Sequence, residues 1–179
     1  MSYQDIIQFW FKDTAPDQWF EANPAFDELI RSRYLGLMHQ AMRCELHEWR
    51  HEPLGRLAEI IVLDQFSRNV FRNTPASFSQ DAQSLVLAQE AVRVQAHTHL
   101  NPTERSFMLL PFMHSESRLI HVTAERLYRE FAPASNYEYE LKHKAVIDQF
   151  GRYPARNAIL GRVSTPEEIE FLKTHGSGF

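Results

Sequence analysis

The chain has 179 residues, 44% of them hydrophobic, and a formal net charge of −4, which suits one domain with a sizeable core. The negative balance gives no electrostatic reason to expect nucleic acid or an anionic membrane as a partner. The single cysteine, Cys44, excludes an internal disulfide and fits a reducing compartment. We expect a cytoplasmic protein, because the sequence shows neither a basic leader nor an apolar run of membrane-spanning length.

Leu, Ala and Glu outnumber Ile and Val, and glycine is scarce, which favours helix over strand. Capping residues followed by proline or an acid mark helix starts. In chain order, the signals predict helices that begin near Ser2, Asn23, Leu37, Leu54, Ala82, Asn101, Ser115, Tyr137 and Thr165. We expect Gly36 to separate two of these segments, Pro111 to end or kink another, and residues 176–178 to form a loose tail. The sequence therefore predicts an all-α fold of about eight to ten helices.

One ten-residue pattern, D-Q-F-x-R-x-x-x-R-N, occurs at Asp64–Asn73 and again at Asp148–Asn157, with six of ten positions identical. An aliphatic run precedes each copy. A repeat of this kind is typical of stacked helical units. We therefore expect a single domain, residues 1–179, with related halves of roughly 1–100 and 101–179.

The repeated pattern has two interpretations. Asp64 and Arg68 stand in the favourable order for an ion pair along a helix, so the two copies can be structural clamps. Alternatively, they can bind a small anion, since the chain holds 15 Arg against 4 Lys and guanidinium groups suit carboxylate and phosphate. In that case Gly151 and Pro154 carry the second copy off its helix, and both copies face one cleft. The candidate ligand-binding residues are Asp64, Arg68, Arg72, Asp148, Arg152, Arg156, Asn157 and Arg162.

Two other strings raise the question of chemistry. His114 and Glu116 follow the proline break in P-F-M-H-S-E and are weak candidates for an acid and a base, with Ser115 as a nucleophile or simply a helix cap. No third, orienting group is visible. His47 and His51 complete an H-E-x-x-H string, the zinc-protease pattern, but Pro53 stops the helix directly afterwards and no third ligand follows at a recognisable spacing. We therefore predict no metal site and no cofactor.

Three motifs together resemble the bacterial domain-of-unknown-function family 924. They are L-D-Q-F-S-R-N at 63–69, L-P-F-M-H-S-E at 110–116 and F-G-R-Y-P-A-R-N-A-I-L-G-R at 150–162. The resemblance runs from the region of Trp19 to that of Glu168, and implies a right-handed, tetratricopeptide-like helical array without implying any activity. Ser67 stands where that family usually has proline, and Ala155 where it often has histidine.

Three functional hypotheses remain open at this level. The first is a binding protein with an Arg-lined cleft for a small anionic metabolite. The second is an interaction module whose helical groove binds a partner's peptide. The third is a hydrolase that uses His114 and Glu116.

Overall fold

The structure is a computed structural model that describes residues 1–175, and within that range it contains helices and no strand. The prediction of an all-α fold is confirmed. Eight α-helices follow one another along the chain: α1 (Tyr3–Gln8), α2 (Pro24–Met42), α3 (Pro53–Val70), α4 (Asp81–Arg93), α5 (Pro102–Met113), α6 (Arg118–Phe131), α7 (Ala134–Phe150) and α8 (Pro166–His175). A π-helix and five short 3₁₀ helices, among them η4 (Pro75–Phe78) and η6 (Pro154–Arg156), lie in the connections. The expected tail at 176–178 falls outside the described residues.

The predicted starts of α2 and α5 are confirmed in detail. The side chain of Asn23 accepts hydrogen bonds from the first turn of α2. Asn101 and Glu104 form a reciprocal capping box at the start of α5. Each helix has proline at its first position, where the missing N–H has no intrahelical partner in any case.

The expected break at Gly36 is wrong, and α5 does not end at Pro111. The helix α2 continues through Gly36 and ends at Met42, because its buried face, with Tyr34, Leu37 and Met38, is continuous across the glycine. That packing outweighs the roughly 1 kcal/mol that glycine costs in a helix. The helix α5 likewise includes Pro111 and continues to Met113, since every residue from Ser106 to Met113 is buried. The next helix begins at Arg118, capped by the Ser117 side chain, rather than near Ser115.

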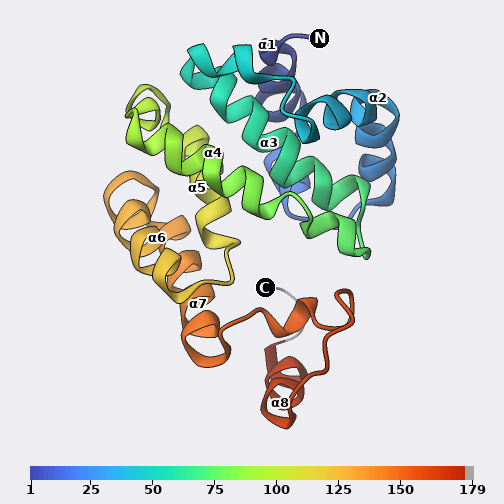
Figure 1. Ribbon diagram of the computed structural model, residues 1–179, viewed down its shortest axis with the longest axis vertical. Helices are drawn as coiled ribbons and strands as arrows, with labels where there is room; N and C mark the ends of the chain where they lie inside the picture. Colours follow the sequence, from blue (N-terminus) through green and yellow to red (C-terminus); the bar gives the residue numbers. More distant parts are fainter. Residues whose placement is uncertain (176–179) are drawn as a thin grey trace.

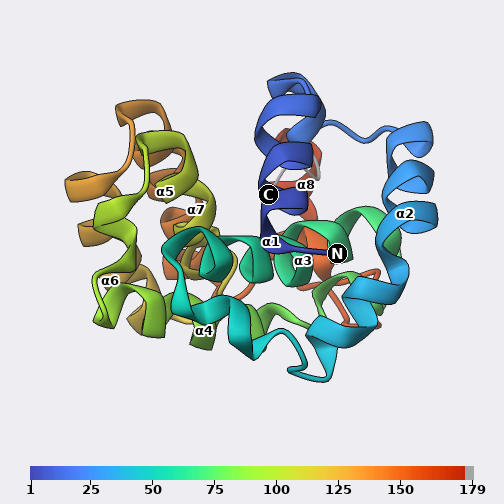
Figure 2. The same cartoon turned by 90° about the horizontal axis from the view of Figure 1, so that it is seen from above.

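The helix α3 is the centre of the fold. It is buried almost all round, from Gly55 to Val70, because α1, α2, α4 and α5 all pack against it. An aromatic cluster that includes Trp10, Tyr34 and Phe66 fills the space between α1, α2 and α3. Seen from above, α2 lies to one side of α3, and α5, α6 and α7 form a layer on the other (Figure 2). Most of the polar residues on α3 are therefore buried.

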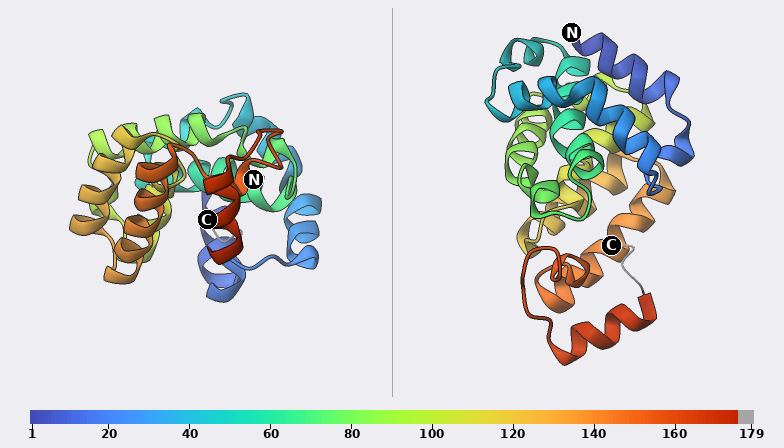
Figure 3. Two further views of the ribbon diagram at one scale, coloured as in Figure 1. Left: turned by 90° about the horizontal axis from the view of Figure 1, so that it is seen from below. Right: turned by 90° about the vertical axis from the view of Figure 1, so that its right-hand side faces the viewer.

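The main hydrophobic core runs from Ile6 to Tyr128, and so crosses the boundary near residue 100 expected between the two halves. A second, small cluster forms around Val146, Ile147 and Tyr153. The helix α8 lies at the far end of the long axis from the N-terminus (Figure 1). The irregular segment between α7 and α8 runs back beside the end of α3 and the connection to α4 (Figure 3). The tetratricopeptide-like array stays a prediction with which this arrangement is compatible, and the division into halves stays a prediction. No helix in residues 1–175 combines the length and apolarity needed to cross a membrane.

Candidate functional site

The first copy of the repeated pattern stays helical to the end of α3, and its polar side chains share one face. Asp64 and Arg68 form the predicted ion pair, with 3.0 Å between Oδ1 and Nη1. Asp64 is 1% exposed. Gln65 Nε2 donates to the other carboxylate oxygen, Oδ2, so the carboxylate is held on both sides. The buried charge is therefore satisfied by neighbours from its own helix.

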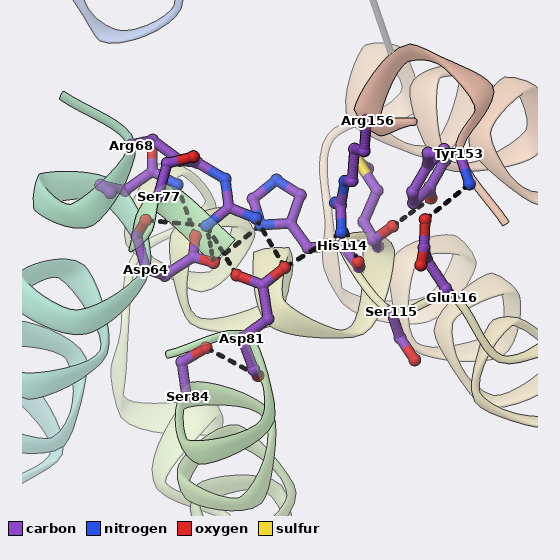
Figure 4. Close-up of polar contacts among 12 residues, drawn as sticks. Asp64, Arg68, Ser77, Asp81, Ser84, His114, Ser115, Glu116, Tyr153 and Arg156 are labelled. Atoms are coloured by element: carbon purple, nitrogen blue, oxygen red, sulfur yellow. Dashed lines mark hydrogen bonds and ion pairs between the residues drawn. The ribbon is translucent and has the colours of Figure 1, made fainter. Parts of the chain in front are cut away.

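The second copy leaves its helix as predicted. Gly151 adopts a left-handed conformation (φ 72°) at the end of α7, a backbone that glycine tolerates without strain. The chain then turns through η6, and Arg156 points back toward α4. Its Nη1 donates to Asp81 Oδ2 at 3.1 Å, and Arg68 donates to both oxygens of the same carboxylate at 3.0 and 3.1 Å (Figure 4). The two copies therefore meet at Asp81.

His114 lies beside this cluster, directly after α5. Its Nδ1 is 2.8 Å from Asp64 Oδ1, and its backbone carbonyl accepts a hydrogen bond from Arg156 at 3.0 Å. Figure 4 shows the ring between the two arginines, with Nε2 pointing away from Asp64. Within residues 1–175, Nε2 has no hydrogen-bond partner. The sequence around His114 shows no group that could orient its ring. In the structure that group is Asp64, fifty residues earlier in the chain.

The charges of this pair follow from their surroundings. Burial raises the pKa of Asp64, but the Arg68 charge and the hydrogen bonds outweigh it, so the pKa lies below its ordinary value and the carboxyl group is ionised at neutral pH. Burial and the nearby Arg68 charge lower the pKa of His114 below 6.5, against the opposing effect of Asp64. A neutral imidazole that donates Nδ1–H to the carboxylate keeps a lone pair on Nε2.

His114 lines two cavities. The smaller, of about 150 Å³, is lined by Trp19, Phe20, Glu21, Gln65, Arg68, Asn69, Arg72 and His114. The larger, of about 410 Å³, is lined by Pro75, Phe78, Ser79, Asp81, Ala82, Leu85, His114, Ser115, Glu116, Arg156 and Leu160. Four of the eight residues around the smaller cavity come from the first copy of the pattern. Among the described residues that line it, Glu21 carries the one carboxylate, whereas Asp81 and Glu116 both line the larger cavity.

The remaining predicted residues lie in separate ion pairs. Arg72 binds Asp27 of α2 through two nitrogen atoms. Arg152 binds Glu168 of α8 in the same two-pronged way, and Asn157 donates to that carboxylate as well. The side chain of Asp148 pairs with Lys144, one helical turn earlier. The predicted arginines are thus gathered on carboxylates, and Asp64, Arg68 and Arg156 share one cluster.

Glu116 is not the partner of His114. Its carboxylate accepts two hydrogen bonds from Arg162 and one from the backbone N–H of Tyr153. It therefore anchors the irregular segment after α7. The hydroxyl group of Ser115 points away from the His114 ring (Figure 4), so these two residues do not form a nucleophile–base pair in this structure.

The H-E-x-x-H string forms a 3₁₀ helix, His47–His51, rather than an α-helical turn. Both imidazoles contact Glu48, at 3.2 and 3.3 Å. In residues 1–175, no cluster of three or more His, Cys, Asp or Glu side chains is arranged to hold a metal ion.

The comparisons with known proteins place this geometry in a family. The model of the family described as "Bacterial protein of unknown function (DUF924)" matches residues 6–176. The chain belongs to this family. A solved structure of a protein of unknown function from Agrobacterium tumefaciens is similar, with 34% sequence identity, a TM-score of 0.91, and coverage of 96% of this chain and 97% of that one. None of the curated proteins matches the chain.

Several residues around the site of this DUF924 protein carry no functional signal in the sequence. Asp81 is the carboxylate that both copies share, and Trp19 and Phe20 line the smaller cavity. Asp81 follows the predicted restart of the chain after Pro75, but nothing in its spacing distinguishes it from other acids at helix starts. Asp64 was named in the sequence, yet its contact with His114 depends on how α3 packs against α5.

Proposed function

We propose that this protein binds a small anion, a carboxylate or a phosphate, in the 150 Å³ cavity beside Arg68 and Arg72. The observation that supports the proposal is the lining of that cavity: two guanidinium groups around a space with one carboxylate in its described wall. That space is large enough to hold several water-sized groups.

The donors for such an anion are in place. Arg72 uses Nε and Nη2 to bind Asp27, which leaves the two N–H bonds of Nη1 without a partner among residues 1–175. Arg68 uses Nη1 and Nη2, and its Nε is likewise unbonded within that range. Because Asp27 and Asp81 already fix both side chains, little rotamer entropy is lost when an anion accepts the remaining hydrogen bonds. Phe20, stacked on Phe107, covers the cavity with an apolar surface.

Isothermal titration with phosphate, sulfate, acetate and succinate, at constant ionic strength in chloride, tests the proposal. We expect at least one of these anions to bind, and to raise the free energy of unfolding by about 2.7 kcal/mol at a hundred times its Kd. Arg72→Gln should abolish that binding. Arg93→Gln removes the same charge from an exposed pair with Glu90 and should not change it.

A further variant separates loss of the cation from loss of the ion pair. Asp27→Asn breaks the same contact as Arg72→Gln but keeps the guanidinium group, so it should retain or strengthen anion binding. Equal loss in both variants would show that the pair has only a structural role. Absence of binding by all four anions would also contradict the proposal.

A further inference from the structure

The contact between Asp64 and His114 joins two features that the proposed binding function does not use. A carboxylate that is 1% exposed fixes Nδ1 of an imidazole at 2.8 Å, and the other ring nitrogen faces away from it without a partner in residues 1–175. The His114 side chain keeps 16% of its surface exposed and lines the cavity proposed for the anion. One ring nitrogen is thus fixed by a buried carboxylate, and the other is left to contact whatever enters the site.

His121 shows the contrast within the same molecule. It is fully buried, its Nδ1 contacts Glu140 at 2.7 Å, and its Nε2 contacts the carbonyl of Ser115 at 2.8 Å. Both ring nitrogens are occupied by protein groups, as expected for a histidine that only supports the fold. His114 also has a carboxylate partner at Nδ1, that of Asp64, but its Nε2 makes no hydrogen bond within residues 1–175.

We propose that Asp64 and His114 form a general-base pair that hydrolyses a carboxylic ester whose acid portion carries a second, anionic group. This inference rests on the proposed function, because the cavity beside Arg68 and Arg72 would hold the anionic group. Esters suit a site with a base but no adjacent nucleophilic hydroxyl group, since an activated water molecule attacks them directly and the same imidazole can protonate the departing oxygen.

The reaction consumes one water molecule and leaves His114 unchanged. Nε2 of the neutral imidazole takes a proton from water while the water oxygen forms a bond to the ester carbonyl carbon, and the C=O electron pair moves to its oxygen. When that intermediate collapses, the bond from carbon to the alcohol oxygen breaks, and the imidazolium of His114 returns the proton to that oxygen. The products are the free acid and the alcohol. Asp64 stabilises the transient imidazolium and holds the tautomer, so it is a positioning residue.

Burial and the Arg68 charge lower the pKa of His114, which keeps the imidazole in its basic form at neutral pH.

The test compares two p-nitrophenyl esters, the hemisuccinate, which carries a carboxylate, and the butyrate, which has a similar length and no charge. We expect hydrolysis of the hemisuccinate above the buffer rate and well above that of the butyrate. His114→Gln should reduce the rate about 10²- to 10⁴-fold, the usual contribution of a general base. The matched control is His47→Gln, because exposed histidines also cleave activated esters and His47 is 62% exposed.

Titration with succinate separates this inference from the proposed function. If succinate binds to the wild type and to His114→Gln alike, but the two cleave the hemisuccinate at the same rate, the catalytic inference is wrong and anion binding stands. If the rates differ as expected and succinate binding persists, both are supported. Asp64→Asn supplies a second readout: kcat should fall and the pH profile should shift, with the KM little changed.

Discussion

Arg68 and Arg156 donate hydrogen bonds to the same carboxylate, that of Asp81, although one lies on α3 and the other follows α7. Both guanidinium groups also stand over the ring of Phe78, at 5.7 and 4.6 Å from its centroid. Two like charges are thereby held close together by one shared acid and one aromatic face. Asp81 carries the counter-charge that makes this approach possible.

Replacing that acid should therefore destabilise the fold. In Asp81→Asn, Arg156 loses the one carboxylate that it pairs with in residues 1–175, whereas Arg68 keeps its pair with Asp64. We therefore expect the free energy of unfolding to fall by about 2–3 kcal/mol, which is less than the cost of breaking a fully buried pair. Urea denaturation measures it. Glu90→Gln removes an exposed partner of Arg93 and should cost under about 1 kcal/mol. Similar losses in the two variants would show that Asp81 has no special role in the fold.

The attachment of α8 should depend on acid pH. Hydrogen bonds from Arg152 and from the backbone of Thr165 lower the pKa of Glu168 from 4.5 to about 2, against a smaller opposing effect of burial. Because the folded pKa lies below the unfolded one, the stabilisation is complete above about pH 4.5 and disappears as the pH falls toward 2. The protection of the α8 amides, measured as the observed exchange rate relative to the intrinsic rate at each pH, should fall over that window and stay constant above it.

The neighbouring residue supplies the control for this prediction. Glu168→Gln should make α8 exchange fast even at neutral pH, since Arg152 and Asn157 then lose a common acceptor. Glu167→Gln changes the same group on the exposed side of the helix and should leave the exchange rates of α8 near those of the wild type. Equal protection in both variants would contradict the role of Glu168.

Two glycine-to-alanine substitutions should change stability in opposite directions. Gly151 has a φ of 72°, so a Cβ there adds backbone strain, and we expect Gly151→Ala to cost about 1 kcal/mol. Gly36 lies inside α2, and the position that an alanine Cβ would take has no neighbouring atom within 4 Å beyond its own helix backbone and chain neighbours. Gly36→Ala should therefore stabilise by about 0.5–1 kcal/mol. Thermal unfolding of both variants measures the two effects, and shifts of the same sign would refute the explanation.

His114 should titrate below its ordinary pKa of 6.5, because burial and Arg68 disfavour the imidazolium. Nitrogen-15 NMR of the histidine side chains should show Nδ1 protonated and Nε2 unprotonated at pH 7. In Asp64→Asn the pKa should fall further, since the favourable charge is lost. A pKa at or above 6.5 in the wild type would mean that the imidazolium is stabilised instead, and would remove the base from the proposed reaction.

The sequence predicted the helical class well, because its start signals are local. A cap and a proline such as Asn101 and Pro102 determine where a helix begins without reference to the rest of the chain. The helix α2 continues past Gly36, and α5 continues past Pro111, for the opposite reason: burial of the surrounding helix faces decides whether such a residue is tolerated, and burial is a tertiary property.

The candidate site shows the same difference between local features, which the sequence predicts, and features that depend on tertiary packing. The ion pair between Asp64 and Arg68 is local and was predicted, and so was the release of the second copy from its helix at Gly151. The contacts of Asp81 with Arg156, and of Asp64 with His114, join residues 75 and 50 positions apart. No spacing rule reports such contacts, because they depend on how α3, α4 and the end of α5 pack.

The backbone turn at Gly151 has a consequence for how the chain tolerates insertions. Five peptide units separate it from Arg156, and over that distance the chain must leave α7, form η6 and aim a guanidinium group at α4. One extra residue would move that group by up to about 3.5 Å, more than the length of the hydrogen bond to Asp81. The length of this loop is therefore as strict a requirement as the identity of its side chains. Homologues with a longer or shorter loop should lack the contact between Arg156 and Asp81.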